Sequence, residues 1–147
     1  MNNKEIPKSS KVVIIGGGVI GCSVAYHLTK FGWRDVVLLE RDQLTSGTTW
    51  HAADLVSQLG PTAAVTKIRK YTLDLYKKLE KEVNHSAGLR INGALSIAQT
   101  DARWQELQRQ ATTAQLYDVD IKILDKDQIK KNYPMMYTED LKGGVLM

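Results

Sequence analysis

The segment Lys11-Val-Val-Ile-Ile-Gly-Gly-Gly-Val-Ile-Gly21 gives the strongest indication of the fold. Its β-branched run, residues 12–15, is typical of a strand that is buried on both faces in a parallel sheet. Residues 19–31 then predict a helix that ends at Gly32, with one apolar stripe formed by Ile20, Val24, Leu28 and Phe31. A second apolar run, Val36–Leu39, follows. The order strand, glycine turn, helix and strand predicts a βαβ unit and an α/β fold.

Three glycines of this stretch fit the pattern G-x-G-x-x-G, which binds the pyrophosphate of dinucleotides. Gly16 allows a tight exit from the strand, Gly18 lets a phosphate approach the backbone, and Gly21 lets the helix pack closely on the sheet. The helix start at Val19 and Ile20 is expected to direct free N–H groups and the positive end of the helix dipole at the phosphates.

An acidic residue follows the second strand at the distance that this pattern requires. Glu40 can accept hydrogen bonds from the ribose 2′- and 3′-hydroxyls, and its charge would repel the 2′-phosphate of NADP. Arg41 either lies over the adenine or stays in solvent. These features predict a site for an ADP-ribose-like group, whereas a glycine-rich turn with a surface glutamate is the simpler alternative. They do not choose between FAD and NAD.

The loop after Arg41 favours FAD. The glycine motif lies at the N-terminal end of the chain, and residues 43–60 are small, polar and rich in hydroxyls, with at most a short helical turn. A standard NAD domain would continue into another helix and strand there. Hydroxyl and backbone N–H groups suited to the pyrophosphate or the flavin edge come from Ser46, Gly47, Thr48 and Thr49. Trp50 either packs beside the flavin ring or is simply a buried aromatic residue.

Three segments carry a resemblance to a known family. GGGVIGCSVAYHL, VVLLER and Leu44-Thr-Ser-Gly-Thr-Thr-Trp-His-Ala-Ala53 resemble the D-amino-acid-oxidase-like flavoenzymes, and among them the sarcosine and dimethylglycine dehydrogenases most closely. The resemblance continues through GALSIAQT and Tyr133-Pro134. It implies a Rossmann-like FAD-binding fold of the glutathione-reductase type. Residues 11–147 would be the incomplete N-terminal part of an FAD-dependent oxidoreductase domain, preceded by a polar tail, residues 1–10.

The resemblance also implies a cofactor link and a reaction. In those dehydrogenases the histidine of the Trp-His pair is bonded to the 8α carbon of FAD, which assigns this role to His51. The alternative is a histidine that only forms a hydrogen bond in the loop. The family continues Trp-His-Ala-Ala with glycine, where this chain has Asp54. The implied reaction is the oxidation of an N-methyl amine such as sarcosine or dimethylglycine, with hydride transfer to flavin and electrons passing to a separate acceptor.

Two other functions stay open, and no catalytic residue is assigned within the chain. One is a non-catalytic regulatory module, because the regulatory subunit of pyruvate dehydrogenase phosphatase resembles the same group, although without the Trp-His pair. The other is an NAD-binding dehydrogenase domain, against which the loop with Trp50 and His51 argues. The substrate-facing parts of the family would lie beyond Met147. We therefore expect these 147 residues alone to bind FAD weakly at best and to be inactive.

The rest of the chain predicts alternating helices and strands. A helix from Pro61 to about Asn84 should have an inner face formed by Val65, Ile68, Thr72, Leu75 and Leu79. Residues 89–99, around Gly93, suit two short strands or one bulged strand. We expect Asp101 to cap a helix that runs to about residue 116, with Leu107, Ala111 and Ala114 on its inner face. A strand at residues 121–124 should follow. Asp125 should then cap a short helix that stops before Pro134. Residues 143–147 predict the start of another strand, or an edge strand.

Composition excludes several classes of protein. The chain has 43% hydrophobic residues, a formal net charge of +4 without a long basic run, and a single cysteine. These features argue against a disordered chain, a nucleic-acid-binding protein, a disulfide scaffold and a multi-cysteine metal site. No apolar run approaches the length of a membrane span. The polar N-terminus favours the cytoplasm, whereas eukaryotic relatives would place the protein in the mitochondrial matrix.

Overall fold

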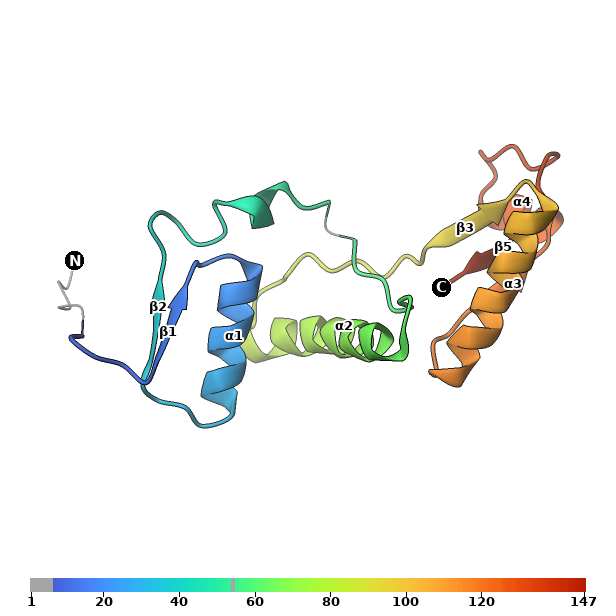
Figure 1. Ribbon diagram of the computed structural model, residues 1–147. Coiled ribbons are helices and arrows are strands. Elements are labelled where there is room, and N and C mark those ends of the chain that lie inside the picture. The colour runs from blue at the N-terminus through green and yellow to red at the C-terminus, as the bar shows by residue number, and fades with distance from the viewer. Residues whose placement is uncertain (1–6, 54) are drawn as a thin grey trace. The chain divides into compact units, whose positions relative to one another are not determined.

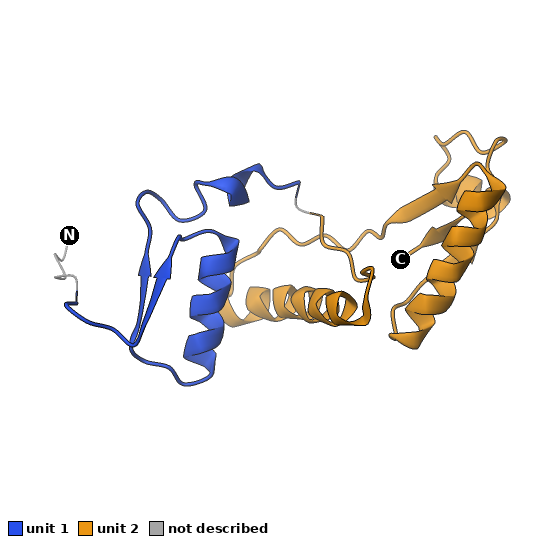
Figure 2. Cartoon of the chain, viewed as in Figure 1, with its two compact units in different colours: residues 1–54 blue, residues 55–147 orange. Residues whose placement is uncertain are grey.

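The computed structural model describes residues 7–53 and 55–147, which belong to two compact units, residues 1–54 and 55–147 (Figure 2). Unit 1 contains strand β1 (Val12–Ile15), helix α1 (Val19–Lys30), strand β2 (Val36–Leu39) and a short 3-10 helix, η1 (Thr48–His51). Unit 2 contains α2 (Ala63–Val83), β3 (Leu95–Ala98), α3 (Asp101–Leu116), β4 (Lys122–Leu124), α4 (Lys126–Asn132) and β5 (Gly143–Leu146).

Unit 1 is the predicted βαβ unit. β1 and β2 are parallel neighbours, in a register that runs from the pair Val12 and Val36 to the pair Ile15 and Leu39, and α1 connects them (Figure 1). Gly32 ends α1 with a φ of +88°, which favours glycine. Its N–H donates to the Thr29 carbonyl at 3.0 Å, and the N–H of Trp33 donates to the Leu28 carbonyl at 3.0 Å. These two bonds form a Schellman motif, so the predicted C-terminal glycine of α1 is confirmed.

One burial prediction for unit 1 is wrong. β1 is not buried on both faces: its side chains alternate between half-buried and exposed, and Ile15 is 87% exposed. The apolar stripe of α1 is exposed at Ile20, Val24 and Phe31 and half-buried at Leu28. The helix approaches β1 through Gly21, which is buried, and a Cβ built there would lie 3.4 Å from Ile14 Cγ2. A two-stranded sheet with one helix leaves the remaining apolar faces uncovered.

Unit 2 is built on an antiparallel sheet in the order β3-β5-β4. β5 therefore lies in the centre, which excludes the edge-strand alternative for residues 143–147. Leu107 and Ala111 of α3 pack against Ala98 and Val145, as their predicted inward positions require. A second cluster joins Ile129 of α4 to Leu124 and Leu141.

Helix starts in unit 2 follow side-chain capping. Asp125 caps α4 as predicted: its carboxylate accepts from the Gln128 N–H at 2.8 Å, and the Gln128 side chain accepts from the Asp125 N–H at 3.0 Å. α3 is capped by Thr100 and not by the predicted Asp101, which lies in the first turn. α2 is capped by Thr62, so it begins two residues after Pro61. Threonine hydroxyls therefore cap both helices, whose starts lie within two residues of the predicted positions.

Two other predictions for unit 2 need correction. The inner face of α2 is marked by the buried residues Thr66 and Leu73, whereas Ile68 is exposed. Thr66 Oγ1 accepts from the Gly60 N–H at 3.0 Å, which turns this face toward the preceding loop. Of residues 89–99, only Leu95–Ala98 form a strand, β3. Among the described residues, no helix is both long and apolar enough to cross a bilayer.

Candidate functional site

The glycine turn lies at the carboxyl ends of β1 and β2, the edge at which open α/β sheets bind ligands. Gly16 ends β1 with a φ of +103°, a conformation that favours glycine. Its N–H donates to the Leu39 carbonyl at 2.8 Å, so the two strands stay paired up to the turn. All of the residues predicted from the sequence to bind the cofactor fall within unit 1.

Three further glycines of the turn have close neighbours, and only Gly21 meets backbone. A Cβ at Gly21 would overlap the Gly16 carbonyl oxygen, and one at Gly18 would lie 2.9 Å from Thr49 Oγ1. Gly17 was not among the predicted site residues, because the pattern leaves its position open. A Cβ there would lie 2.5 Å from Leu44 Cδ2, so a larger residue would require the Leu44 side chain to move. The run of three consecutive glycines was the available signal.

Glu40 lies at the mouth of the turn and forms two hydrogen bonds. Its Oε2 accepts from the Gly17 N–H at 2.6 Å, and its Oε1 accepts from the Asp42 N–H at 3.1 Å. The bond from Gly17, followed by that from Asp42, lowers the pKa of the Glu40 carboxyl below its usual range, because both bonds favour the charged form. The carboxylate is therefore an acceptor that also holds the turn in shape.

The loop after β2 folds back onto the turn. The N–H of Thr45 donates to the Gly17 carbonyl at 3.0 Å, and Thr49 Oγ1 accepts from the Val19 N–H at 2.9 Å. The expectation that the N–H of Val19 is free is therefore wrong, since a side-chain hydroxyl takes the acceptor position at the helix start. Within the described residues, the N–H groups of Gly18 and Ile20 have no hydrogen-bond acceptor. The anion site is thus partly filled by protein atoms and partly open.

The other predicted residues lie further along the same loop. Arg41, Ser46 and Thr48 are exposed, and their side chains form no hydrogen bond to the turn. Trp50 is 74% exposed, so it is not buried by the described residues. Asp54, the residue that departs from the family pattern, lies outside the described residues.

His51 ends η1 and has one ring nitrogen engaged. Its Nδ1 lies 3.1 Å from the Gly47 carbonyl oxygen, and its ring meets that of Trp50 edge-on, with the centroids 6.0 Å apart. A carbonyl oxygen only accepts hydrogen bonds, so Nδ1 carries the hydrogen in this arrangement. In the neutral ring the lone pair is then on Nε2, which is the nitrogen able to act as a nucleophile or acceptor.

The contact between Glu40 and Gly17 predicts a measurable pH dependence. A depressed pKa means that the carboxylate stabilises the turn above the pKa of the unfolded chain, and that this stabilisation is lost as pH falls through the lower pKa of the folded chain. The amide NMR signal of Gly17 should therefore shift on acidification, with a midpoint below that of an ordinary glutamate. Glu40→Gln should abolish this transition. A Gly17 signal that titrates equally in both proteins would show that Glu40 is not its partner.

Comparison with known proteins identifies the family of the chain. Residues 11–147 match the sequence profile of the family described as FAD dependent oxidoreductase, called DAO. The chain belongs to this family. The predictions of an α/β flavoprotein fold and of FAD as the cofactor are thereby confirmed, and membership in an FAD family argues against the NAD-binding alternative.

Two relatives and one solved structure define the likeness more closely. The chain is 39% identical to mitochondrial sarcosine dehydrogenase of Homo sapiens over 96% of its length, and 37% identical to mitochondrial dimethylglycine dehydrogenase of Rattus norvegicus over 92%. It covers only 16% of each relative. L-Proline dehydrogenase from P. horikoshii has the same fold, with a TM-score of 0.86 at 23% identity, over 96% of this chain and 37% of that one.

One relative has a name that does not describe an oxidoreductase. The chain is 34% identical to the mitochondrial pyruvate dehydrogenase phosphatase regulatory subunit of Mus musculus, over 95% of its length and 16% of the relative. Family membership therefore establishes the FAD-dependent oxidoreductase domain. It does not distinguish a catalytic protein from a regulatory one, so that distinction depends on the site residues.

Proposed function

We propose that this chain is the FAD-binding N-terminal part of an enzyme that oxidises an N-methyl amine such as sarcosine or dimethylglycine, by hydride transfer to the flavin. The observation that carries the proposal is the glycine turn with Glu40 at its mouth, in a chain that is 39% identical to a sarcosine dehydrogenase. A small N-methyl amine and a separate electron acceptor are the proposed partners. The names of the relatives support a mitochondrial location where the source is eukaryotic, and the cytoplasm is the alternative.

The turn fits the pyrophosphate of FAD. Gly18 presents backbone without a Cβ, and the open N–H groups of Gly18 and Ile20 supply donors at the start of α1. The N–H of Val19 is the third donor, because the Thr49 hydroxyl that now accepts from it can rotate about χ1 and yield its place to a phosphate oxygen. In that position Thr49 would itself donate to the phosphate. The Thr49 hydroxyl thus accepts the hydrogen bond from the Val19 N–H until a phosphate oxygen of FAD replaces it.

The remaining roles follow from the residues around the turn. Glu40 would accept from the ribose hydroxyls, since a carboxylate has more acceptor sites than its two present bonds use. Arg41, Ser46, Gly47 and Thr48 would complete the site from the loop. His51 would bond to the flavin 8α carbon through Nε2, because Nδ1 is engaged by Gly47. When bound, FAD supplies the hydride acceptor, and the residues of this chain hold and orient it.

The proposal is tested on a full-length protein that carries this segment. With sarcosine or dimethylglycine under anaerobic conditions, we expect bleaching of the oxidised flavin absorbance and reduction of an artificial dye, with no response to glycine, which lacks the N-methyl group. The isolated 147-residue chain should bind FAD weakly and show no turnover. Amine-dependent dye reduction by the isolated chain would contradict the proposal that this segment binds FAD and that turnover needs the rest of the protein.

A regulatory module is the second candidate, supported by the match to the mouse regulatory subunit. The same experiment separates the two. A full-length protein that retains FAD but is not reduced by either amine would favour the regulatory module. Trp50 and His51 favour the enzyme, because the family resemblance associates this pair with the flavin link of the dehydrogenases.

A further inference from the structure

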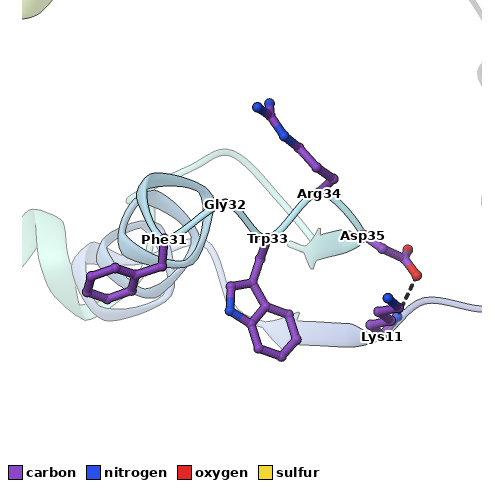
Figure 3. Close-up of a pocket in the computed structure, with 6 residues that line it drawn as sticks. All are labelled: Lys11, Phe31, Gly32, Trp33, Arg34 and Asp35. Carbon is purple, nitrogen blue, oxygen red and sulfur yellow. Dashed lines mark hydrogen bonds between the residues drawn. The ribbon is translucent and has the colours of Figure 1, made fainter.

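One residue in the loop that follows β2 has an unusual backbone conformation. Within residues 7–53 and 55–147, the non-glycine residues with positive φ are Thr45 at +68°, Asn84 at +48° and Asp118 at +51°. Asn84 and Asp118 lie where α2 and α3 end, and residues of their types tolerate this conformation. At the end of α1 the left-handed position is taken by Gly32 (Figure 3). A β-branched threonine tolerates it poorly, so Thr45 is the exception.

Nothing in the immediate surroundings of Thr45 offsets this conformation. The N–H of Ser46 donates to the Gln43 carbonyl at 3.2 Å, which closes a turn with Leu44 and Thr45 at its centre. A positive φ at the third position alone is the pattern of a type II turn, which normally has glycine or asparagine there. The conformation costs threonine a factor of roughly 5 to 30 in population relative to glycine. The Thr45 side chain is exposed, so its own packing does not repay this cost.

Contacts with the glycine turn hold the loop in place. The Thr45 N–H donates to the Gly17 carbonyl at 3.0 Å, and Thr49 accepts from the Val19 N–H at 2.9 Å. Leu44 also lies close to Gly17, since a Cβ there would be 2.5 Å from Leu44 Cδ2. A hydrogen bond between neutral groups contributes a net factor of roughly 2 to 10. These contacts are therefore similar in size to the cost at Thr45, and the closed loop is favoured by a small margin.

We infer that loop 43–49 is a lid that opens to admit FAD, and that Thr45 is the positioning residue that sets how readily it opens. The inference rests on the proposed function, in which the pyrophosphate lies between the N–H groups of the turn and the hydroxyl groups of the loop. A group held between two segments enters and leaves only when the segments separate. Because the left-handed conformation of Thr45 is required only when the loop is closed, its cost favours opening.

Thr45→Gly is the decisive substitution, because glycine keeps the N–H and removes the conformational cost. The closed loop then gains a factor of roughly 5 to 30 over the open loop, both with and without FAD. Uptake and release of FAD should therefore slow by about this same factor, and the Kd should change by less than about twofold.

Thr45→Pro should act in the opposite direction. Proline has no N–H to donate to Gly17 and fixes φ near about −65°, so the loop cannot close in the same way. Uptake and release of FAD should both become faster than in the parent protein. The Kd should rise, because the hydroxyl groups of the loop no longer contact the cofactor.

The rates are measured by stopped-flow flavin fluorescence on a full-length protein that carries this segment. All variants carry His51→Ala as well, so that binding is reversible. Hydrogen-exchange mass spectrometry of the cofactor-free protein gives a second readout that does not depend on FAD. Protection of the peptide that spans residues 44–50 should rise in Thr45→Gly and fall in Thr45→Pro.

Two matched variants make the result specific. Thr45→Val keeps the branched side chain without its hydroxyl and should behave as the parent protein does. Asn84→Gly places glycine at a left-handed position of unit 2 and should leave both rates unchanged.

Three results would overturn the inference and leave FAD binding intact. They are equal rates and equal exchange in the parent protein and Thr45→Gly, a change in the release rate alone, and a Thr45→Val protein that matches Thr45→Gly. A full-length protein that binds no FAD in any of these forms would overturn the proposed function together with this inference.

Discussion

Gly21→Val is expected to yield a full-length protein that purifies without FAD. A Cβ at this position would overlap the Gly16 carbonyl oxygen, which belongs to the backbone of the turn itself. Such an atom cannot rotate away as a flexible side chain would. The helix must instead move off the turn, and the N–H groups of Val19 and Ile20 move with it. The substitution therefore acts on the phosphate site directly, in addition to its effect on packing.

Competing effects of this substitution differ in size. Removing glycine from a helix stabilises it by a few tenths of a kcal/mol when valine is the replacement. Overpacking a close contact costs about 1–3 kcal/mol, and more where backbone is involved. The cost of the clash is therefore larger than the gain in helix propensity. We expect a lower melting temperature and FAD binding weakened by roughly 10- to 100-fold, since about 1.4 kcal/mol corresponds to a factor of ten.

FAD content after gel filtration and thermal unfolding measure the two consequences separately. Gly47→Ala is the matched control for stability, because a Cβ at Gly47 meets no atom within 4 Å and its φ is −84°. This control should melt like the parent protein. A Gly21→Val protein with full FAD content and an unchanged melting temperature would show that the close approach of α1 to the turn does not exist in solution.

Features set by neighbours along the chain could be predicted from the sequence. The βαβ order, the glycine end of α1, the inward positions of α3 and the Asp125 cap all depend on residues within one or two helical turns of each other. Local spacing and capping chemistry determine them, so no knowledge of distant segments is required.

Features set by distant segments could not be predicted in this way. The stripe with Ile20 and Phe31 is apolar at helical spacing, but which face of α1 is covered depends on what packs against it. The bond from the Val19 N–H to Thr49 joins residues 30 positions apart through a loop without a repeating pattern. Gly17 could not be predicted to have close neighbours, because its contact is with Leu44, which follows β2 in the chain. Contacts between a turn and a later loop leave no periodic signal in the sequence.

In the full-length protein, His51→Ala is expected to abolish covalent attachment of the flavin. After acid precipitation the parent protein should give a yellow pellet, and the variant should give a colourless pellet with the flavin in the supernatant. The physical reason is that the Gly47 carbonyl engages Nδ1 and leaves the Nε2 lone pair of the neutral ring available to the 8α carbon. Alanine has no nucleophile to offer, so the effect is complete and not partial.

His85→Ala is the matched control for this experiment, because it removes an exposed histidine of unit 2 to which no role is assigned. It should keep the yellow pellet, and digestion of that pellet should give a flavin-bearing peptide that contains residue 51. The His51→Ala protein should still bind FAD reversibly through the glycine turn, since Gly18, Ile20 and Glu40 are unchanged. Colour that washes away from the parent protein, or that persists in the pellet of His51→Ala, would show that His51 is not the covalent link. FAD binding by the glycine turn would be unaffected by either result, because it rests on Gly18, Ile20 and Glu40.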